Sequence, residues 1–297
     1  MGFFLNIFET VYLFVRDIGM RMSPLKHFQN DPPDYRPEKF EKLLRRVKPT
    51  LIQKTATHWI VRCKLGSEIR ETNIFLLHTF DPRKPSITFH HGAGQINHML
   101  PATFILGTKI LQAFNVFVIK AQKHSSAYVY LSEAVDSFFH QQQMFAGSVL
   151  ATEEIVRYHK KHSTKPIIVS GASMGGIVAT LHAFVFGTAD YYVPLTAYPN
   201  VGEIFLGSAY RFAVAGWNEK RKKKEYLDSY RVDKRFSKSL ASRIFPVLGK
   251  YDKVVPFAKS ETFWKKQGIR PGVYPYGHFT SIVKRLEIRK LILKLIN

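Results

Sequence analysis

Two kinds of residue are scarce in this sequence, and each scarcity narrows the class of protein. There is one cysteine, Cys63, which excludes an internal disulfide framework and a zinc or iron–sulfur site built from cysteines. Acidic residues are also few, because 22 Asp and Glu stand against 44 Lys and Arg, which gives a net charge of +22. The surface must therefore carry a positive field, and nucleic acid, an anionic membrane or an acidic substrate would each fit it.

Apolar residues, in contrast, are plentiful. They make up 45% of the 297 residues, which is enough to bury a large core and excludes a disordered tail protein. The length fits one large domain with an extension. A reducing compartment fits the single cysteine, so we expect a cytoplasmic protein.

The N-terminal 22 residues are strongly apolar, but Glu9, Arg16 and Asp17 keep every run below the roughly 18 apolar residues of a membrane span. On a helix these polar residues gather on one narrow side, which predicts an amphipathic helix. No basic segment precedes the apolar run, and Asn6 breaks the myristoylation pattern, so we expect neither a secretory signal nor that lipid anchor. Two roles remain open for the helix: packing on the protein's own core, or docking on a membrane surface.

Prolines within residues 31–37 predict a linker after this helix. We therefore expect residues 1–49 to form an extension and residues 50–297 to form the folded body. In that body, short apolar runs alternate with helical patterns, two of which cover residues 144–160 and 176–186. This alternation predicts an α/β fold with a mostly parallel central sheet and helices on both faces. The expected strands are 59–63, 74–77, 87–89, 116–119, 167–169, 191–195 and 245–248.

The strongest motif is Gly171-Ala172-Ser173-Met174-Gly175, a G-x-S-x-G sequence between an expected strand and an expected helix. Such a tight turn forces the serine into a strained backbone conformation, and only glycine avoids collisions beside it. The hydroxyl then stands at the N-terminus of a helix, where backbone N–H groups face a developing anion. Ser173 is therefore the candidate nucleophile.

A serine nucleophile needs a base, and the base needs an acid that orients it. Asp252 lies in a turn just past the expected strand 245–248, at the sheet edge where catalytic groups of α/β proteins gather. His278 follows in a Gly-His turn before the last helix. The other acids considered do not directly follow an expected core strand. They are Asp190, Glu203, Asp228 and Asp233.

These segments resemble the α/β-hydrolase fold superfamily, and the resemblance covers nearly all of residues 50–297. The order Ser173, Asp252, His278 is the chain order of that family's triad. A further segment agrees, because the expected strand 87–89 leads into His-His-Gly-Ala-Gly, which is similar to the family's oxyanion loop. The resemblance implies that the backbone N–H groups of Met174 and of Ala93, or of its neighbour Gly92, bind the oxyanion.

The activity implied by the resemblance is a serine hydrolase that cleaves a carboxylic ester through a Ser-His-Asp triad and an acyl-enzyme, without a cofactor. A peptidase or a thioesterase with the same triad remains an alternative, as does a catalytically silent basic scaffold that binds membrane or nucleic acid. We expect no specific nucleic-acid partner, because no nucleic-acid-binding motif is present. A metal site is not expected either, because His90, His91 and His98 form no ligand motif.

A cap insertion is expected near residues 200–242, where this family commonly covers its active site. The aromatic residues Tyr210, Phe212 and Trp217 in this stretch favour a hydrophobic or lipid-like ester as substrate. The basic run 220–224 and the basic C-terminal helix, together with the N-terminal helix, predict peripheral contact with an anionic membrane. The apolar face of the C-terminal helix is expected to pack on the sheet. The sequence leaves the oligomeric state open.

Overall fold

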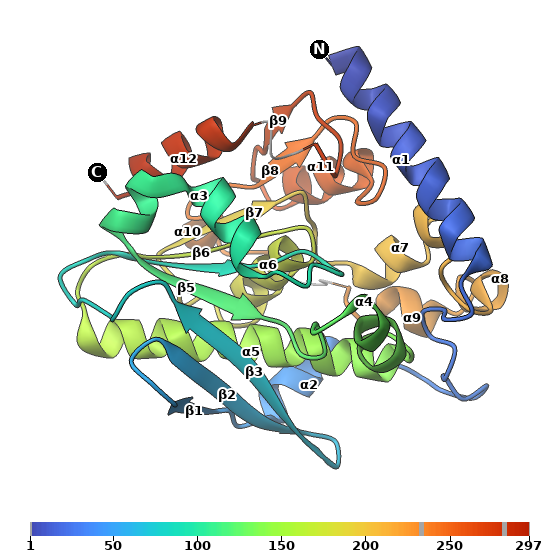
Figure 1. Ribbon diagram of the computed structural model, residues 1–297, viewed down its shortest axis with the longest axis horizontal. Helices are drawn as coiled ribbons and strands as arrows, with labels where there is room; N and C mark the ends of the chain where they lie inside the picture. Colours follow the sequence, from blue (N-terminus) through green and yellow to red (C-terminus); the bar gives the residue numbers. More distant parts are fainter. Residues whose placement is uncertain (1, 232–234, 281–283, 297) are drawn as a thin grey trace.

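The computed structural model describes residues 2–231, 235–280 and 284–296. Within these residues, nine strands form one sheet in the order β1-β2-β3-β5-β4-β6-β7-β8-β9 (Figure 1). Strands β1, β2, β3 and β5 pair antiparallel, whereas β5, β4, β6, β7, β8 and β9 pair parallel. The strands are β1 Thr50–Gln53, β2 His58–Leu65, β3 Glu68–Leu76, β4 Ser86–His90, β5 Asn115–Lys120, β6 Ile167–Ala172, β7 Tyr191–Leu195, β8 Val247–Gly249 and β9 Gly272–Tyr274.

Helices cover both faces of this sheet, which explains why its central strands are apolar on both sides. Ile167 and Val169 of β6 belong to the core beneath α5 (Phe138–His162), α6 (Met174–Val185) and α11 (Phe257–Lys266). Ile168, between them, faces the opposite core, beneath α3 (Met99–Ala113) and α12 (Arg285–Lys294). Successive strand residues point to opposite faces, so both faces need a cover. The predicted α/β architecture with a mostly parallel sheet is confirmed.

The C-terminal helix α12 packs as expected. Ile288 and Ile292 are buried in the core with α3 and the sheet. Arg289 of α12 also donates hydrogen bonds to the Phe104 and Ile105 carbonyls of α3. These carbonyls lie just before Gly107, whose positive φ of 70° kinks α3. A Cβ at Gly107 would collide with the Arg289 guanidinium, so the kink and the arginine fit together.

The segment before residue 50 also contributes to the core. Helix α2 (Phe40–Arg46) buries Phe40, Leu43 and Leu44, and Phe28 is buried ahead of it. Phe28 packs against Phe138 of α5, with ring centroids 5.1 Å apart. Besides α1 (Gly2–Met22), the first 49 residues therefore include a segment, from Phe28 to α2, whose apolar side chains pack against the body.

Short helices fill the expected cap region between β7 and β8. They are α7 Val201–Phe205, a 3₁₀ turn Ser208–Tyr210, α8 Trp217–Lys220, α9 Lys224–Asp228 and α10 Lys238–Ala241. The remaining helical segments are α4 Ala127–Val129 and a π turn Tyr130–Ala134. Among the described helices, none is both long and apolar enough to cross a bilayer.

Candidate active site

Ser173 occupies the sharp turn between β6 and α6, at φ 55° and ψ −116°. A positive φ is costly for a residue with a β-carbon, and it persists here because the surrounding backbone leaves no other path. A Cβ at Gly171 would lie 2.5 Å from the Gly175 carbonyl carbon, and one at Gly175 would collide with the His90 carbonyl oxygen. The two glycines of the motif are thus required by close backbone contacts, and the turn exposes the serine hydroxyl.

The structure brings the three predicted side chains together. The Ser173 Oγ lies 2.8 Å from His278 Nε2, and His278 Nδ1 lies 2.8 Å from Asp252 Oδ2. The second carboxylate oxygen, Oδ1, accepts the backbone N–H groups of Val254 and Val255 at 2.9 and 2.8 Å. These two bonds fix the carboxylate so that it accepts the Nδ1 proton. Nε2 is then left to accept the serine proton.

The electrostatics of His278 favour its charged form. Burial of the imidazole opposes protonation, but the adjacent Asp252 carboxylate and, more weakly, Glu9 outweigh it, so the pKa of His278 is raised above 6.5. A base that gains a proton next to a buried carboxylate is stabilised as imidazolium. The group is thereby prepared to remove a proton from Ser173.

Glu9 is a residue of this site that the sequence did not indicate. Its carboxylate is fully buried and accepts the backbone N–H groups of His278 at 2.8 Å and Phe279 at 3.2 Å. Burial raises the pKa of Glu9 despite these two hydrogen bonds. A Cβ at Gly277 would collide with this carboxylate, so the Gly-His turn is also the docking point for α1. No local pattern marks Glu9, because its partners lie at the other end of the chain.

The expected oxyanion donors lie on both sides of Ser173. Met174 begins α6, where the first N–H groups of a helix have no partner within it. The Gly92 N–H instead donates to Gln95 Oε1 at 2.8 Å, so the Gln95 side chain occupies it. In the described loop after β4, the backbone N–H of Ala93 donates no hydrogen bond. Met174 and Ala93 are therefore the better placed pair of the three candidates.

The histidines ahead of this loop hold its backbone. His90 bonds the His91 carbonyl and Ser148 Oγ, at 2.8 and 3.0 Å. His91 donates to the Gly92 carbonyl at 2.7 Å and accepts the Ala121 N–H at 3.0 Å, so it is neutral. Burial lowers the pKa of His90 to about 4, and it also lowers the pKa of His91 well below its ordinary value. The described residues contain no cluster of three metal-ligating side chains.

The alternative acids have other partners. Asp190 accepts the Ile167 N–H, Glu203 accepts the Tyr198 hydroxyl, and Asp228 pairs with Arg231. Asp233 lies outside the described residues. Asp252 is thus the acid that the fold places beside His278.

A cavity of about 520 Å³ opens at Ser173. Its described wall is mainly apolar and comes chiefly from the loop after β4 and from α3, rather than from the cap region. Of the cap aromatics expected there, Tyr210 lines a second hollow of about 20 Å³ behind Ser173, whereas Phe212 lies beneath Arg21 and Trp217 beneath Arg221. The larger cavity is lined by Gly92, Ala93, Gln95, Leu100, Pro101, Phe104, Ile105, Ala172, Ser173, Thr196, His278 and Phe279.

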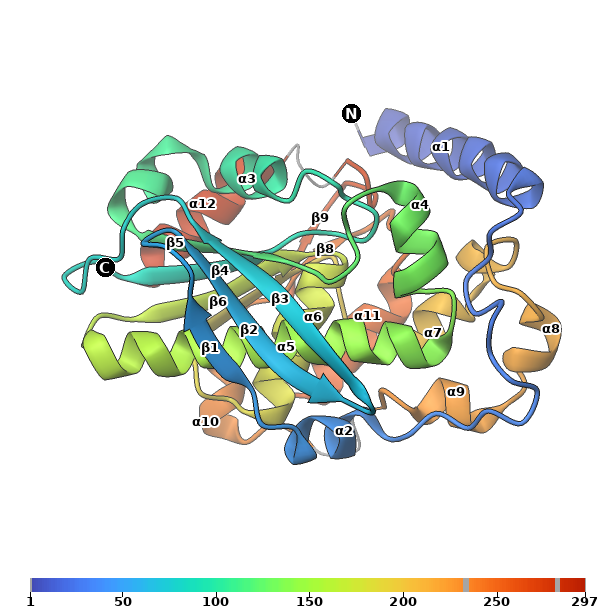
Figure 2. The same cartoon turned by 60° about the horizontal axis from the view of Figure 1, so that its bottom comes forward.

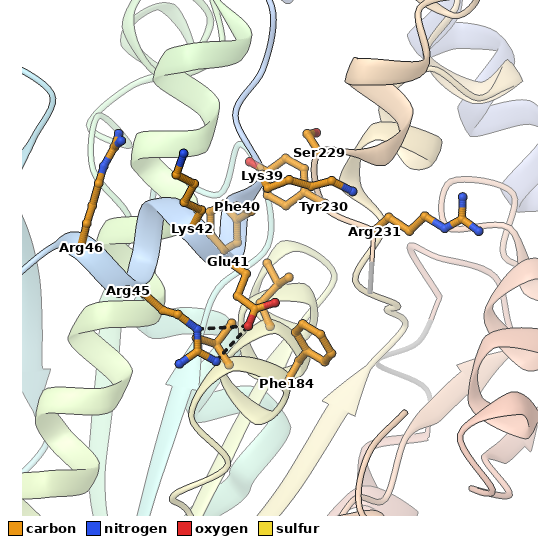
Figure 3. Close-up of a pocket in the computed structure, with 12 residues that line it drawn as sticks. Lys39, Phe40, Glu41, Lys42, Arg45, Arg46, Phe184, Ser229, Tyr230 and Arg231 are labelled. Carbon is orange, nitrogen blue, oxygen red and sulfur yellow. Dashed lines mark hydrogen bonds and ion pairs between the residues drawn. The ribbon is translucent and has the colours of Figure 1, made fainter. Parts of the chain in front are cut away.

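Another cavity, of about 580 Å³, lies by α2 and contains none of the predicted site residues. Figure 3 shows that its cationic side chains do not converge: Arg45 is bonded to Glu41, while Arg46 and Arg231 lie on opposite sides of the view, away from each other. Arg46 is paired with Glu38 at 2.7 Å. This hollow thus has a mainly apolar lining with paired charges at its rim, and its described lining does not include Ser173, Asp252 or His278.

No protein-family model and no curated protein matches the chain. Solved structures match its fold. An acetyl xylan esterase from Thermoanaerobacterium sp. is 15% identical, with a TM-score of 0.53 over 94% of this chain and 98% of that one. Another, from Paenibacillus sp. R4, is 13% identical, with a TM-score of 0.55 over 98% and 94%.

An acylaminoacyl peptidase from Pyrococcus horikoshii is 12% identical, with a TM-score of 0.50 over 84% of this chain and 42% of that one. At such identities the likeness concerns the fold. Together with the strand order and the turn at Ser173, it shows that the chain has the α/β-hydrolase fold.

Proposed function

We propose that this protein is a serine hydrolase that cleaves a carboxylic ester of a hydrophobic substrate. The observation that carries the proposal is the unbroken hydrogen-bond chain from Ser173 through His278 to Asp252, opening into an apolar cavity. A nucleophile, its base and the acid that orients the base are the minimum for acyl transfer. A silent scaffold has no need for a strained serine held in this geometry.

The mechanism follows from the positions of these groups. His278 Nε2 accepts the Ser173 proton as Oγ attacks the ester carbonyl carbon, and the Met174 and Ala93 N–H groups bind the oxygen that becomes negative. Asp252 stabilises the imidazolium. His278 then protonates the departing alkoxide, which leaves an acyl-enzyme. Water, deprotonated by His278, attacks that intermediate and releases the acid.

The cavity wall supports an apolar substrate. Among its described lining residues, His278 is the one titratable side chain. None of the described lining residues is a carboxylate or a side chain with a fixed positive charge that could hold the charged terminus of a peptide, which favours an ester over a peptidase substrate. A volume of about 520 Å³ lies within the usual range for a small-molecule site of roughly 300–1,000 Å³. The names of two similar structures, both acetyl xylan esterases, also favour ester chemistry, whereas the peptidase of similar fold keeps that alternative open.

Labelling with a fluorophosphonate probe tests the nucleophile. The wild type should be labelled, and Ser173→Ala should lose the label and about 10⁴- to 10⁶-fold in ester turnover. Ser67→Ala, at an exposed serine in the turn between β2 and β3, should be labelled like the wild type. Undiminished labelling of Ser173→Ala would assign the nucleophile to another residue and refute the proposal.

The substrate class is tested with a panel of p-nitrophenyl esters of increasing acyl length, matched acyl thioesters and N-acyl peptide amides. We expect kcat/KM to rise with acyl length and to be highest for the esters. A preference for the peptide amides would assign the site to the peptidase alternative.

A further inference from the structure

Helix α1 is attached to the protein by its polar side. Glu9 is buried against the His278 loop, and Thr10 accepts a hydrogen bond from Lys253 Nζ at 2.7 Å. Arg16 donates to the Ala209 carbonyl and lies over the Tyr210 ring, 5.1 Å from its centroid. An amphipathic helix normally turns its apolar face to the core. Here the polar side is used for attachment, and the apolar side is left facing outward.

The outward side of α1 forms a continuous apolar stripe. Its side chains are between 42% and 81% exposed, and their positions along the helix place them together on one broad face. Monomeric soluble proteins rarely expose contiguous apolar patches of this kind, and such patches mark interaction surfaces. The stripe, which we call the α1 stripe, consists of Phe4, Ile7, Phe8, Val11, Tyr12, Phe14, Val15, Ile18 and Met22.

The α1 stripe continues to the mouth of the active-site cavity. The ring centroids of Tyr12 and Phe279 lie 4.0 Å apart, and Phe279 lines that cavity. Across the mouth, Leu100 and Phe104 of α3 line the same cavity and are themselves exposed. Figure 2 shows α1 and α3 on the same upper side of the molecule, in agreement with Figure 1. One apolar surface therefore surrounds the entrance to Ser173.

Cations border this surface. Arg21 and Arg211 lie against the Phe212 ring, 3.7 and 4.4 Å from its centroid, beside the C-terminal end of α1. Lys253 lies by the middle of α1, and Arg285 lies over Phe104 at the mouth. The two acidic residues of α1 add little negative charge that would oppose this, because Glu9 is buried and the partly exposed Asp17 is paired with Arg16.

We infer that the α1 stripe and the exposed cavity mouth form a docking surface for an anionic lipid bilayer. A helix that lies in the membrane interface needs an apolar face to enter the acyl boundary and basic residues to meet anionic headgroups. Both are present on the side that carries the cavity mouth. A second copy of this chain would bring a like pattern of cations against these cations, so charge complementarity favours the bilayer. The inference concerns binding and stands apart from the proposed hydrolase activity.

Co-sedimentation with vesicles tests it, using the full chain with Ser173→Ala so that turnover does not alter the lipid. We expect binding to vesicles of phosphatidylcholine mixed with phosphatidylglycerol, and weaker binding to phosphatidylcholine alone. Adding Phe8→Ser and Phe14→Ser should lower the partition coefficient at least about tenfold, because two aromatic rings leave the interface. Adding Arg21→Gln and Arg211→Gln should lower it about tenfold on the anionic vesicles only, as should high salt.

Ile69→Ser is the matched control, because Ile69 is an equally exposed apolar residue on β3. It should bind like the parent, and circular dichroism should show that every variant is folded. Three results would each overturn the inference: no vesicle binding by the parent, equal binding by the α1-stripe variant, or equal binding to both kinds of vesicle. Sedimentation velocity without lipid provides a fourth overturning result. A dimer that is dissociated by Phe8→Ser and Phe14→Ser would show that the α1 stripe binds a second copy of the chain.

Discussion

Glu9 changes how the reactive histidine must be understood. The imidazole is held by Asp252 through its side chain and by Glu9 through its own backbone N–H, so two buried carboxylates surround it. Each negative charge stabilises the imidazolium, and both contribute to the raised pKa of His278. Glu9 touches neither the nucleophile nor the cavity. It therefore acts as a positioning residue for the loop that carries the base.

We expect Glu9→Gln to shift the acidic limb of the kcat/KM profile to lower pH. Removing the negative charge lowers the pKa of His278, and the neutral imidazole required for proton abstraction then persists to lower pH. The amide also faces one of the two backbone N–H groups with its own NH₂, so the free energy of unfolding should fall by about 1–3 kcal/mol. The measurements are a pH–rate profile with a short soluble ester and a urea titration.

Asp17→Asn is the control for this change, because it removes the same charge from the same helix at a site paired with Arg16. Its acidic limb should stay close to that of the wild type. Identical shifts in both variants would mean that the overall charge of α1, rather than the Glu9 contact, sets the pKa of His278.

Gly175 offers a second prediction for a single residue. Gly175→Ala would place a methyl group against the His90 carbonyl oxygen, so the turn at Ser173 must open. We expect the free energy of unfolding to fall by about 2 kcal/mol or more and ester turnover to be lost. Gly19→Ala is the contrasting variant, since nothing lies within 4 Å of the added atom and alanine favours a helix by up to about 1 kcal/mol. Urea unfolding of the two variants should therefore move in opposite directions.

At the scale of elements, the shape of α3 depends on a contact outside the helix. Its kink at Gly107 is held by Arg289 of α12, which occupies the carbonyls of Phe104 and Ile105, and these two residues also line the cavity. A change in α12 is thereby transmitted to the cavity wall. If the proposed esterase activity is correct, we expect the C-terminal helix to influence which acyl groups fit.

Arg289→Gln should alter substrate preference more than it alters catalysis. We expect the ratio of kcat/KM for a long-chain over a short-chain ester to change several-fold, with an unfolding free energy lower by about 1–2 kcal/mol. Lys290→Gln, at an exposed position of the same helix, should leave the ratio unchanged. A uniform loss for all chain lengths would instead show that Arg289 supports the fold without shaping the cavity.

The prediction of elements from the sequence succeeded where burial is strongest. The seven expected strands all overlap observed ones, because runs such as that of β6 are apolar on both faces. Strands β1 and β9 lie at the two edges of the sheet, are short, and bury few side chains, so periodicity does not mark them. For α1 the helix itself was predicted, but its hydropathy pattern favours attachment by the apolar side, whereas the contacts of Glu9, Thr10 and Arg16 attach the polar side.

At the scale of the whole molecule, the features of the site that could be predicted are those made by residues close together in the sequence. The turn at Ser173 and the loops of Asp252 and His278 have local signatures, and each follows a strand that ends at the same edge of the sheet. The hydrogen bond from the Gly92 N–H to Gln95 and the contact of Glu9 with the His278 loop have no local sequence signature, because both arise from tertiary packing. The origin of the cavity wall in α3 rather than in the cap region is of the same kind.

The hydrogen bond between Glu9 and His278 joins residues 269 positions apart. Closing a loop of that length is entropically costly, and such long-range contacts form late in folding. We therefore expect the contact between Glu9 and the His278 loop to form after the central sheet has assembled. In refolding from urea, we expect helical ellipticity to return before ester turnover does. The two signals would be followed by stopped-flow circular dichroism and by timed dilution into substrate, and simultaneous recovery in the wild type would contradict late closure.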